Sequence, residues 1–162
     1  MRLDYQKEIP EVGRALRELS RIVEESTLEP ALCELVKLRA SQINGCAYCV
    51  DMHTKDARAE GEDEQRLHLV AVWQEAPVFS ARERAALAWT EALTLLPETG
   101  APDDVYEEVT REFSPREQVA LTAAIVGING WNRLSVGFRR PVGQYVSRRG
   151  RRPQSSPEPV ST

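Results

Sequence analysis

The chain has 162 residues, which is enough to bury one hydrophobic core and suits a single domain. Its net charge is −4, and six of its 21 basic residues lie beyond Phe138, so the rest of the chain is more acidic than the total suggests. This balance argues against nucleic acid as the main partner. Three cysteines are too few for a disulfide framework, and the charged first ten residues are untypical of a signal peptide.

The longest apolar stretch, residues 119–128, is too short to cross a membrane. We therefore expect a cytoplasmic protein that has no membrane contact. In that compartment a pair of nearby cysteines is typically catalytic or metal-binding, because structural disulfides are rare there.

Apolar residues recur at helical spacing through the first half of the chain, between clear turn signals. Pro10 suits a first helical turn, Asn44-Gly45 is a turn signal, and Gly61 is placed to cap a helix in the left-handed conformation. These signals predict helices over residues 10–25, 30–43, 46–60 and 63–72.

The second half of the chain contains two capping boxes, in which a serine precedes a glutamate by three residues. They begin at Ser80 and Ser114, and they predict helices over residues 81–96 and 115–138, with a further amphipathic helix over residues 103–113 between them. Residues 97–102 are predicted to form a loop. The last helix is apolar on nearly every side, so we expect it to be central in the bundle or in a subunit interface.

These patterns predict an all-α fold, a bundle of about six to seven helices formed by residues 1–140. From Pro141 the composition shifts to proline, serine and arginine. Residues 141–162 are therefore expected to form a tail that is disordered over about its last ten residues. We expect the chain beyond Arg148 to be dispensable, so that a protein ending near Tyr145 keeps its melting temperature and its activity.

The chemistry of the sequence is concentrated in a C-x-x-C motif, Cys46 and Cys49, that follows the Asn44-Gly45 turn. On a helix, Cys46 and Cys49 are one turn apart, and His53 follows Cys49 by another turn, so the three side chains share one face. Two thiols at that spacing can form a disulfide, and an imidazole beside them can accept a proton. By helix position alone, the first cysteine has the lower pKa and would be the nucleophile.

Five residues carry a family resemblance: Glu34, Cys46, Tyr48, Cys49 and His53, with the spacing E-x11-C-x-Y-C-x3-H. With the surrounding LVKLRASQINGCAYC, this pattern resembles the alkylhydroperoxidase D-like branch of the carboxymuconolactone decarboxylase family, over roughly residues 3–140. The resemblance implies the helical bundle of that branch, assembled as a trimer or a trimer-based hexamer.

The resemblance also implies roles for the site residues. Cys49 attacks the peroxide, Cys46 resolves the product to a disulfide, and Glu34 and His53 relay protons. On residue chemistry alone, Glu34 could instead stabilise a helix N-terminus, and Tyr48 could either donate a hydrogen bond to a peroxide or simply pack. The helix position alone favours Cys46, but His53 is nearer to Cys49, so we follow the resemblance and expect Cys49 to attack the peroxide.

The predicted function is that of a thiol-dependent hydroperoxidase, an antioxidant enzyme with peroxiredoxin-type activity that needs neither a cofactor nor a metal. Its partners would be a hydroperoxide and an external dithiol or disulfide reductase. The sequence identifies neither the hydroperoxide nor the reductant.

Three other functions compete with this one. Cys46, Cys49, His53 and Glu34 form an acceptable set of zinc ligands by residue type, although the chain lacks the second cysteine or histidine pair that is usual in structural zinc sites. Alternatively, Cys46 and Cys49 could form the regulatory disulfide of an interaction protein that does not catalyse turnover. A lyase of the decarboxylase type is less favoured, because that branch of the family lacks the C-x-x-C pair.

Overall fold

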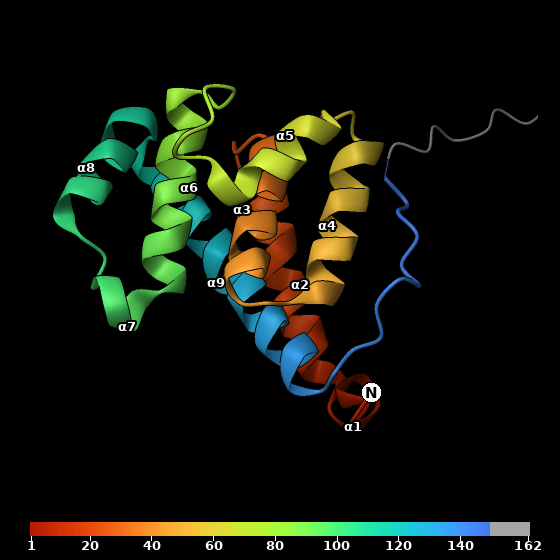
Figure 1. The fold of residues 1–162 in the computed structure, drawn as a ribbon. Helices are drawn as coiled ribbons and strands as arrows, with labels where there is room; N and C mark the ends of the chain where they lie inside the picture. The colour runs from red at the N-terminus through yellow and green to blue at the C-terminus, as the bar shows by residue number, and fades with distance from the viewer. Residues whose placement is uncertain (150–162) are drawn as a thin grey trace, which may run out of the picture.

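The computed structural model describes residues 1–149, and within them it contains nine α-helices, one 3-10 turn and no strand (Figure 1). The predicted all-α fold is confirmed. The elements are α1 (Tyr5–Glu8), α2 (Pro10–Glu24), α3 (Pro30–Ile43), α4 (Ala47–Ala59), α5 (Glu64–Leu69), η1 (Val70–Val72), α6 (Ala81–Thr94), α7 (Leu96–Thr99), α8 (Asp103–Glu112) and α9 (Pro115–Gly137).

The helix count exceeds the predicted six to seven because α1 and α7 are single turns of four residues each. Helix α7 occupies part of the predicted loop over residues 97–102. Its second residue is Pro97, which suits a first helical turn, and Gly100 ends it in the left-handed conformation with a φ of 66°. Both predicted capping boxes are present at the starts of α6 and α9.

Helix α3 is the centre of the bundle, because α4, α6 and α9 all pack against it (Figure 1). Its core residues Leu35, Val36 and Leu38 are almost completely buried. The sequence had predicted a central or interfacial place for the helix that proved to be α9. A helix packed on several sides positions its polar residues rigidly, and Glu34 is one of those residues.

Helix α9 packs against α2 at two glycines. A Cβ atom at Gly127 would lie 3.5 Å from the Leu19 side chain, an ordinary contact, whereas one at Gly130 would lie 3.1 Å from the Leu16 side chain, which would have to shift. The other face of α9 is apolar and exposed, with Val119 at 71% and Val126 at 56% exposure.

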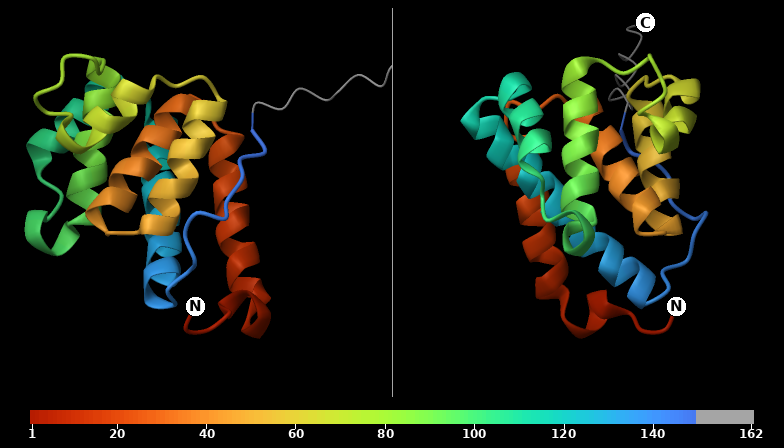
Figure 2. Two further views of the ribbon diagram at one scale, coloured as in Figure 1. Left: turned by 45° about the vertical axis from the view of Figure 1, so that its right-hand side comes forward. Right: turned by 60° about the vertical axis from the view of Figure 1, so that its left-hand side comes forward.

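The segment that follows α9 runs alongside α4 (Figures 1 and 2), where it contacts Lys55 and Asp56. Residues 141–149 contain no helix, yet they contact α4 at several points. We call these residues the strap. The predicted disorder of the last ten or so residues lies outside the described part of the chain. No helix within residues 1–149 is long and apolar enough to cross a membrane.

Candidate active site

A tight turn places the C-x-x-C motif at the start of α4. Asn44 ends α3, and Gly45 has a φ of 63°, a conformation that glycine adopts without steric cost. Cys46 is then the N-cap residue of α4, and its sulfur accepts a hydrogen bond from the backbone N–H of Cys49 at 3.4 Å. The helix start predicted from the turn signal is confirmed.

The two sulfurs of this motif lie 2.6 Å apart and both are buried. The pKa of Cys46 is lowered to about 7, because its sulfur accepts hydrogen bonds from the Cys49 thiol and backbone N–H, although burial opposes the shift. The pKa of Cys49 is raised, because its thiol donates to Cys46 and because it is buried. The hydrogen bond between the two thiols thus favours the thiolate form of Cys46, the cysteine that helix position alone favours.

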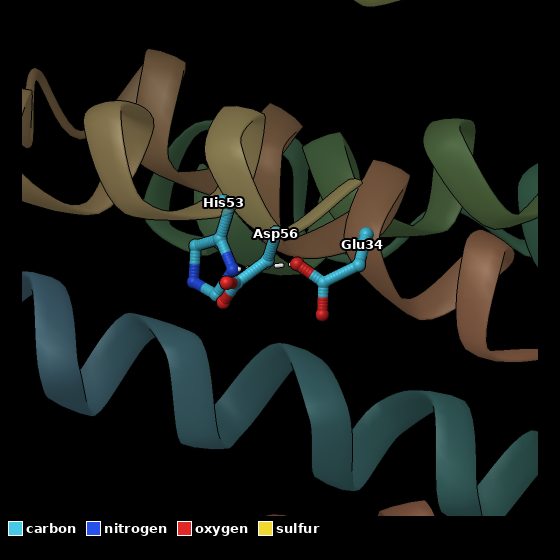
Figure 3. Close-up of side chains that lie close together, drawn as sticks. All are labelled: Glu34, His53 and Asp56. Carbon is cyan, nitrogen blue, oxygen red and sulfur yellow. Dashed lines mark hydrogen bonds and ion pairs between the residues drawn. The ribbon is translucent and has the colours of Figure 1, made fainter. Parts of the chain in front are cut away.

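Glu34 and His53 form a buried pair between α3 and α4 (Figure 3). His53 Nδ1 lies 2.8 Å from Glu34 Oε2, and the other oxygen of Glu34 accepts a hydrogen bond from Lys37 at 3.0 Å. Burial alone would raise the pKa of Glu34, but the hydrogen bond with His53 and the nearby charges lower it to about 2. The carboxylate is thus ionised at neutral pH and can orient the imidazole.

The two thiols line different cavities. Cys49 lines a cavity of about 260 Å³ beside Tyr48, Met52 and Trp131. Cys46 lines a surface depression of about 510 Å³, which Arg139 and Arg140 also line. A third cavity, of about 340 Å³, lies beside His53 and shares Met52 and Trp131 with the Cys49 cavity. A substrate and a reductant can therefore approach different sulfurs of one pair.

Comparison with known proteins identifies the family. The model of the carboxymuconolactone decarboxylase family matches residues 10–92, which is about half of the chain and includes the whole C-x-x-C region. The chain belongs to this family.

Two relatives illustrate its place in the family. The uncharacterized protein YdfG of Bacillus subtilis is 38% identical over 137 residues, 85% of this chain and 93% of its own. A protein of unknown function from Agrobacterium tumefaciens, for which a role as the antioxidant defence protein AhpD has been suggested, is 48% identical. Its crystal structure has a TM-score of 0.85, with 89% of this chain and 99% of that chain covered.

A third protein, the debrominase Bmp8, is similar in fold: its structure has a TM-score of 0.77 over 86% of this chain and 75% of its own. At 18% identity this match shows the fold alone. One fold can support several chemistries, so the function of this family member has to be argued from its site.

Tyr48 lies beside the thiols but does not hydrogen-bond to them. Its ring is stacked beneath the guanidinium of Arg140, 4.0 Å from the ring centroid, and burial raises the pKa of its hydroxyl. The ring lines the cavities on both sides of the thiol pair. Both readings of Tyr48 from the sequence, packing and hydrogen bonding to a peroxide, are compatible with this position.

Sequence reasoning missed several residues of the site. Asp56, one turn after His53, is buried beside it, and Tyr145 of the strap donates hydrogen bonds to both Asp56 oxygens, at 2.8 and 3.0 Å. Arg149 contacts carboxylates of α2, α3 and α4. The expectation that the chain beyond Arg148 is dispensable therefore needs correction at Arg149, because this side chain is only 29% exposed and reaches the candidate relay.

Asn132 of α9 was assigned no chemistry from the sequence, yet it is buried and holds the turn that positions the cysteines. Its amide nitrogen donates to Ser41 at 3.0 Å, and its oxygen accepts from Asn44 at 2.9 Å. We expect Asn132→Ala to lower the free energy of unfolding by about 1–3 kcal/mol, because Ser41 and Asn44 each lose a buried partner. Urea denaturation would measure this loss, with the exposed Val136→Ala on the same helix as the control. A loss no larger than that of the control would contradict the assigned role.

The described residues bring together a different set of potential metal ligands from the one that the sequence suggested. Ligand atoms of Glu34, His53 and Asp56 lie within 4.8 Å of one another (Figure 3). The two thiols are not in this group. Positive charge is already supplied there by Lys37, 3.0 Å from Glu34, and by Arg149, whose guanidinium lies 3.4 Å from Glu34 and 3.7 Å from Asp56. The donor set is thus neutralised by protein cations.

Proposed function

We propose that this protein is a thiol-dependent hydroperoxidase that cycles between a Cys46–Cys49 dithiol and a disulfide. The observation that carries this proposal is the pair of sulfurs 2.6 Å apart at a helix start, where the hydrogen bond with Cys49 lowers the pKa of Cys46 to about 7. A thiolate is the form that reacts with a peroxide, and a second thiol at this distance can capture the product. The suggested antioxidant role of the Agrobacterium relative supports the same chemistry.

In the proposed reaction, His53 removes one proton from the thiol pair. The proton that remains on the pair moves between the two sulfurs, so that Cys49 becomes the thiolate when a hydroperoxide occupies the cavity beside it. Cys49 is assigned the attack because it lies one helical turn from His53 and lines that cavity with Trp131. Glu34 keeps the imidazole in position through its bond to Nδ1.

The attack breaks the O–O bond of the hydroperoxide. Cys49 becomes a sulfenic acid, and the leaving alkoxide takes a proton from His53 to become an alcohol. The Cys46 thiol then attacks the Cys49 sulfur, which forms the disulfide and releases water. One dithiol is oxidised and one hydroperoxide is reduced, and an external dithiol restores the pair by thiol–disulfide exchange.

A turnover assay tests this proposal. The protein would be incubated with hydrogen peroxide, with a short alkyl hydroperoxide and with a fatty-acid hydroperoxide, each with dithiothreitol or dihydrolipoamide as donor. We expect catalytic oxidation of at least one donor, and its loss when both thiols are replaced. Formation of the disulfide without turnover under every combination would instead favour the redox-switched interaction protein.

The same proposal includes a homo-oligomer, a trimer or a trimer-based hexamer, in a cytoplasm that keeps the thiols reduced. The structural support is the exposed apolar face of α9, where Val119 and Val126 lie on one surface with a shallow depression formed with Tyr106 of α8. Light scattering at micromolar concentration should give a mass about three or six times the 18.2 kDa of one chain. A mass near 18.2 kDa would contradict it.

A further inference from the structure

The strap is anchored to α4 by three separate contacts. The backbone N–H of Gly143 donates to Asp51 at 3.3 Å, the Lys55 ammonium donates to the Tyr145 carbonyl at 3.0 Å, and the Tyr145 hydroxyl bonds to Asp56. All three partners lie on the helix that carries Cys49 and His53. Figure 2 shows the strap following α4 along its length. These contacts bring the end of the strap to the relay.

Arg149, at the end of this strap, meets four carboxylates from three helices. Its guanidinium lies 2.7 Å from Glu60, 3.4 Å from Glu34, 3.5 Å from Glu24 and 3.7 Å from Asp56. Asp56 lies on α4 and Glu60 is the residue that caps the end of α4, whereas Glu34 lies on α3 and Glu24 on α2. Arg149 also lines the cavity beside His53.

Two of these carboxylates are deeply buried, Glu34 at 1% and Asp56 at 4% exposure. Two buried carboxylates with nearby oxygens repel each other, and each would tend to take up a proton unless positive charge compensates it. Lys37 contacts only Glu34, whereas Arg149 lies within ion-pair distance of both. Its charge therefore favours the ionised form of the carboxylate that accepts the hydrogen bond from His53.

We propose that Arg149 is a positioning residue for the proton relay: its guanidinium holds the Glu34 carboxylate against His53, and the strap delivers it there. This inference rests on the proposed function, because it assigns the Glu34–His53 pair to peroxide reduction. It also makes the strap part of the candidate active site, although the strap lies outside residues 10–92, the region that the family model matches. The strap closes one side of the cavity beside His53 at the same time.

The charged and titratable groups that face Glu34 come from each neighbouring element. They are Lys37 on α3, His53, Asp56 and Glu60 on α4, Glu24 on α2, and Tyr145, Arg148 and Arg149 on the strap. Helix α9 contributes apolar side chains to this cavity, Ile128 and Trp131 among them. Without Arg149, the permanently charged side chain that still forms an ion pair with Glu34 among residues 1–149 is Lys37.

The test measures the titration of Glu34 by NMR of its side-chain carboxyl carbon, a readout that needs no peroxidase activity. In the unaltered protein the pKa of Glu34 is lowered to about 2. In Arg149→Gln we expect this pKa to rise, because the guanidinium is one of the cations, with Lys37, that favour the charged form. Arg149→Lys should restore most of the lowered value.

Arg116→Gln is the control, because it removes the same charge from an exposed position at the start of α9. Arg116 has no ion pair with the described residues and does not line the cavity beside His53, so its loss should leave the Glu34 titration unchanged. Tyr145→Phe provides a second variant in case Arg149→Gln fails to fold. It loosens the strap while it keeps every charge at neutral pH, and it should raise the pKa of Glu34 in the same direction by a smaller amount.

The outcomes separate the two proposals. An unchanged pKa of Glu34 in Arg149→Gln would overturn the role of Arg149, even if the protein is an active peroxidase. If Arg149→Gln does not fold, an unchanged pKa of Glu34 in Tyr145→Phe would overturn it. A raised pKa of Glu34 in Arg149→Gln, in a protein that reduces no peroxide, would support the positioning role of Arg149 and contradict the proposed function. In an active enzyme, the single-turnover rate at neutral pH should fall in Arg149→Gln, because Glu34 is held less firmly against His53, and Arg149→Lys should recover most of it.

Discussion

The Cys46→Ser variant is expected to consume about one equivalent of hydroperoxide and then to stop, with Cys49 as a sulfenic acid. The reason is that Cys49 can still attack, whereas no second thiol lies within reach to form the disulfide. A dimedone-type probe followed by peptide mass analysis would locate the modification. The Cys49→Ser variant should lose fast peroxide consumption, yet its Cys46 should still form a mixed disulfide with a small thiol, because Cys46 lines the open depression.

Cys33→Ser is the control for both variants. Cys33 is buried on α3, away from the pair, and burial raises its pKa to about 11, so it should contribute no thiolate at neutral pH. The structure makes the opposite order a serious alternative, because the pKa of Cys46 is the one that is lowered. A sulfenic acid on Cys46 in the Cys49→Ser protein, formed at nearly the unaltered rate, would show that Cys46 is the nucleophile.

The His53→Ala variant should slow the reaction with peroxide by about 100-fold at neutral pH, the effect expected for a lost general base. The effect should shrink as the pH rises above the ordinary thiol pKa of about 8.5, because hydroxide can then remove the proton. Single-turnover rates measured from pH 6 to pH 10 by stopped-flow would reveal this convergence. Glu34 stays ionised over that whole range, since its pKa is lowered to about 2.

The chain supplies its own control for this variant, since His68 is the second of its two histidines. The His68 side chain is 66% exposed on α5, so His68→Ala should leave the rate unchanged at every pH. A His53→Ala deficit that stays constant up to pH 10 would point to a packing role for the imidazole and would remove it from the relay.

Local sequence patterns predicted the elements of the site well. The Asn44-Gly45 turn, the start of α4 at Cys46 and the left-handed Gly61, with a φ of 96°, all depend on residues close together in the chain. The pairing of Glu34 with His53 joins two helices, and only the family resemblance indicated it. Spacing along one helix contains no information about the facing helix.

The missed residues share a physical reason. The hydrogen bond from Tyr145 to Asp56 spans 89 positions in the chain, and the one from Asn132 to Ser41 spans 91. Such contacts depend on how the helices pack, which hydrophobic periodicity does not specify. The ion pairs of Arg149 with four carboxylates were missed for the same reason, because those carboxylates are far from it in the sequence.

The most direct test of the proposed function is a titration of the reduced protein with hydroperoxide in the absence of any donor. Free thiols would be counted at each step, and the product would be mapped by mass spectrometry after alkylation. We predict that about one equivalent of peroxide removes two thiols, that the product is a Cys46–Cys49 disulfide, and that Cys33 stays free. Survival of both thiols in the presence of excess peroxide, or a disulfide that includes Cys33, would contradict it.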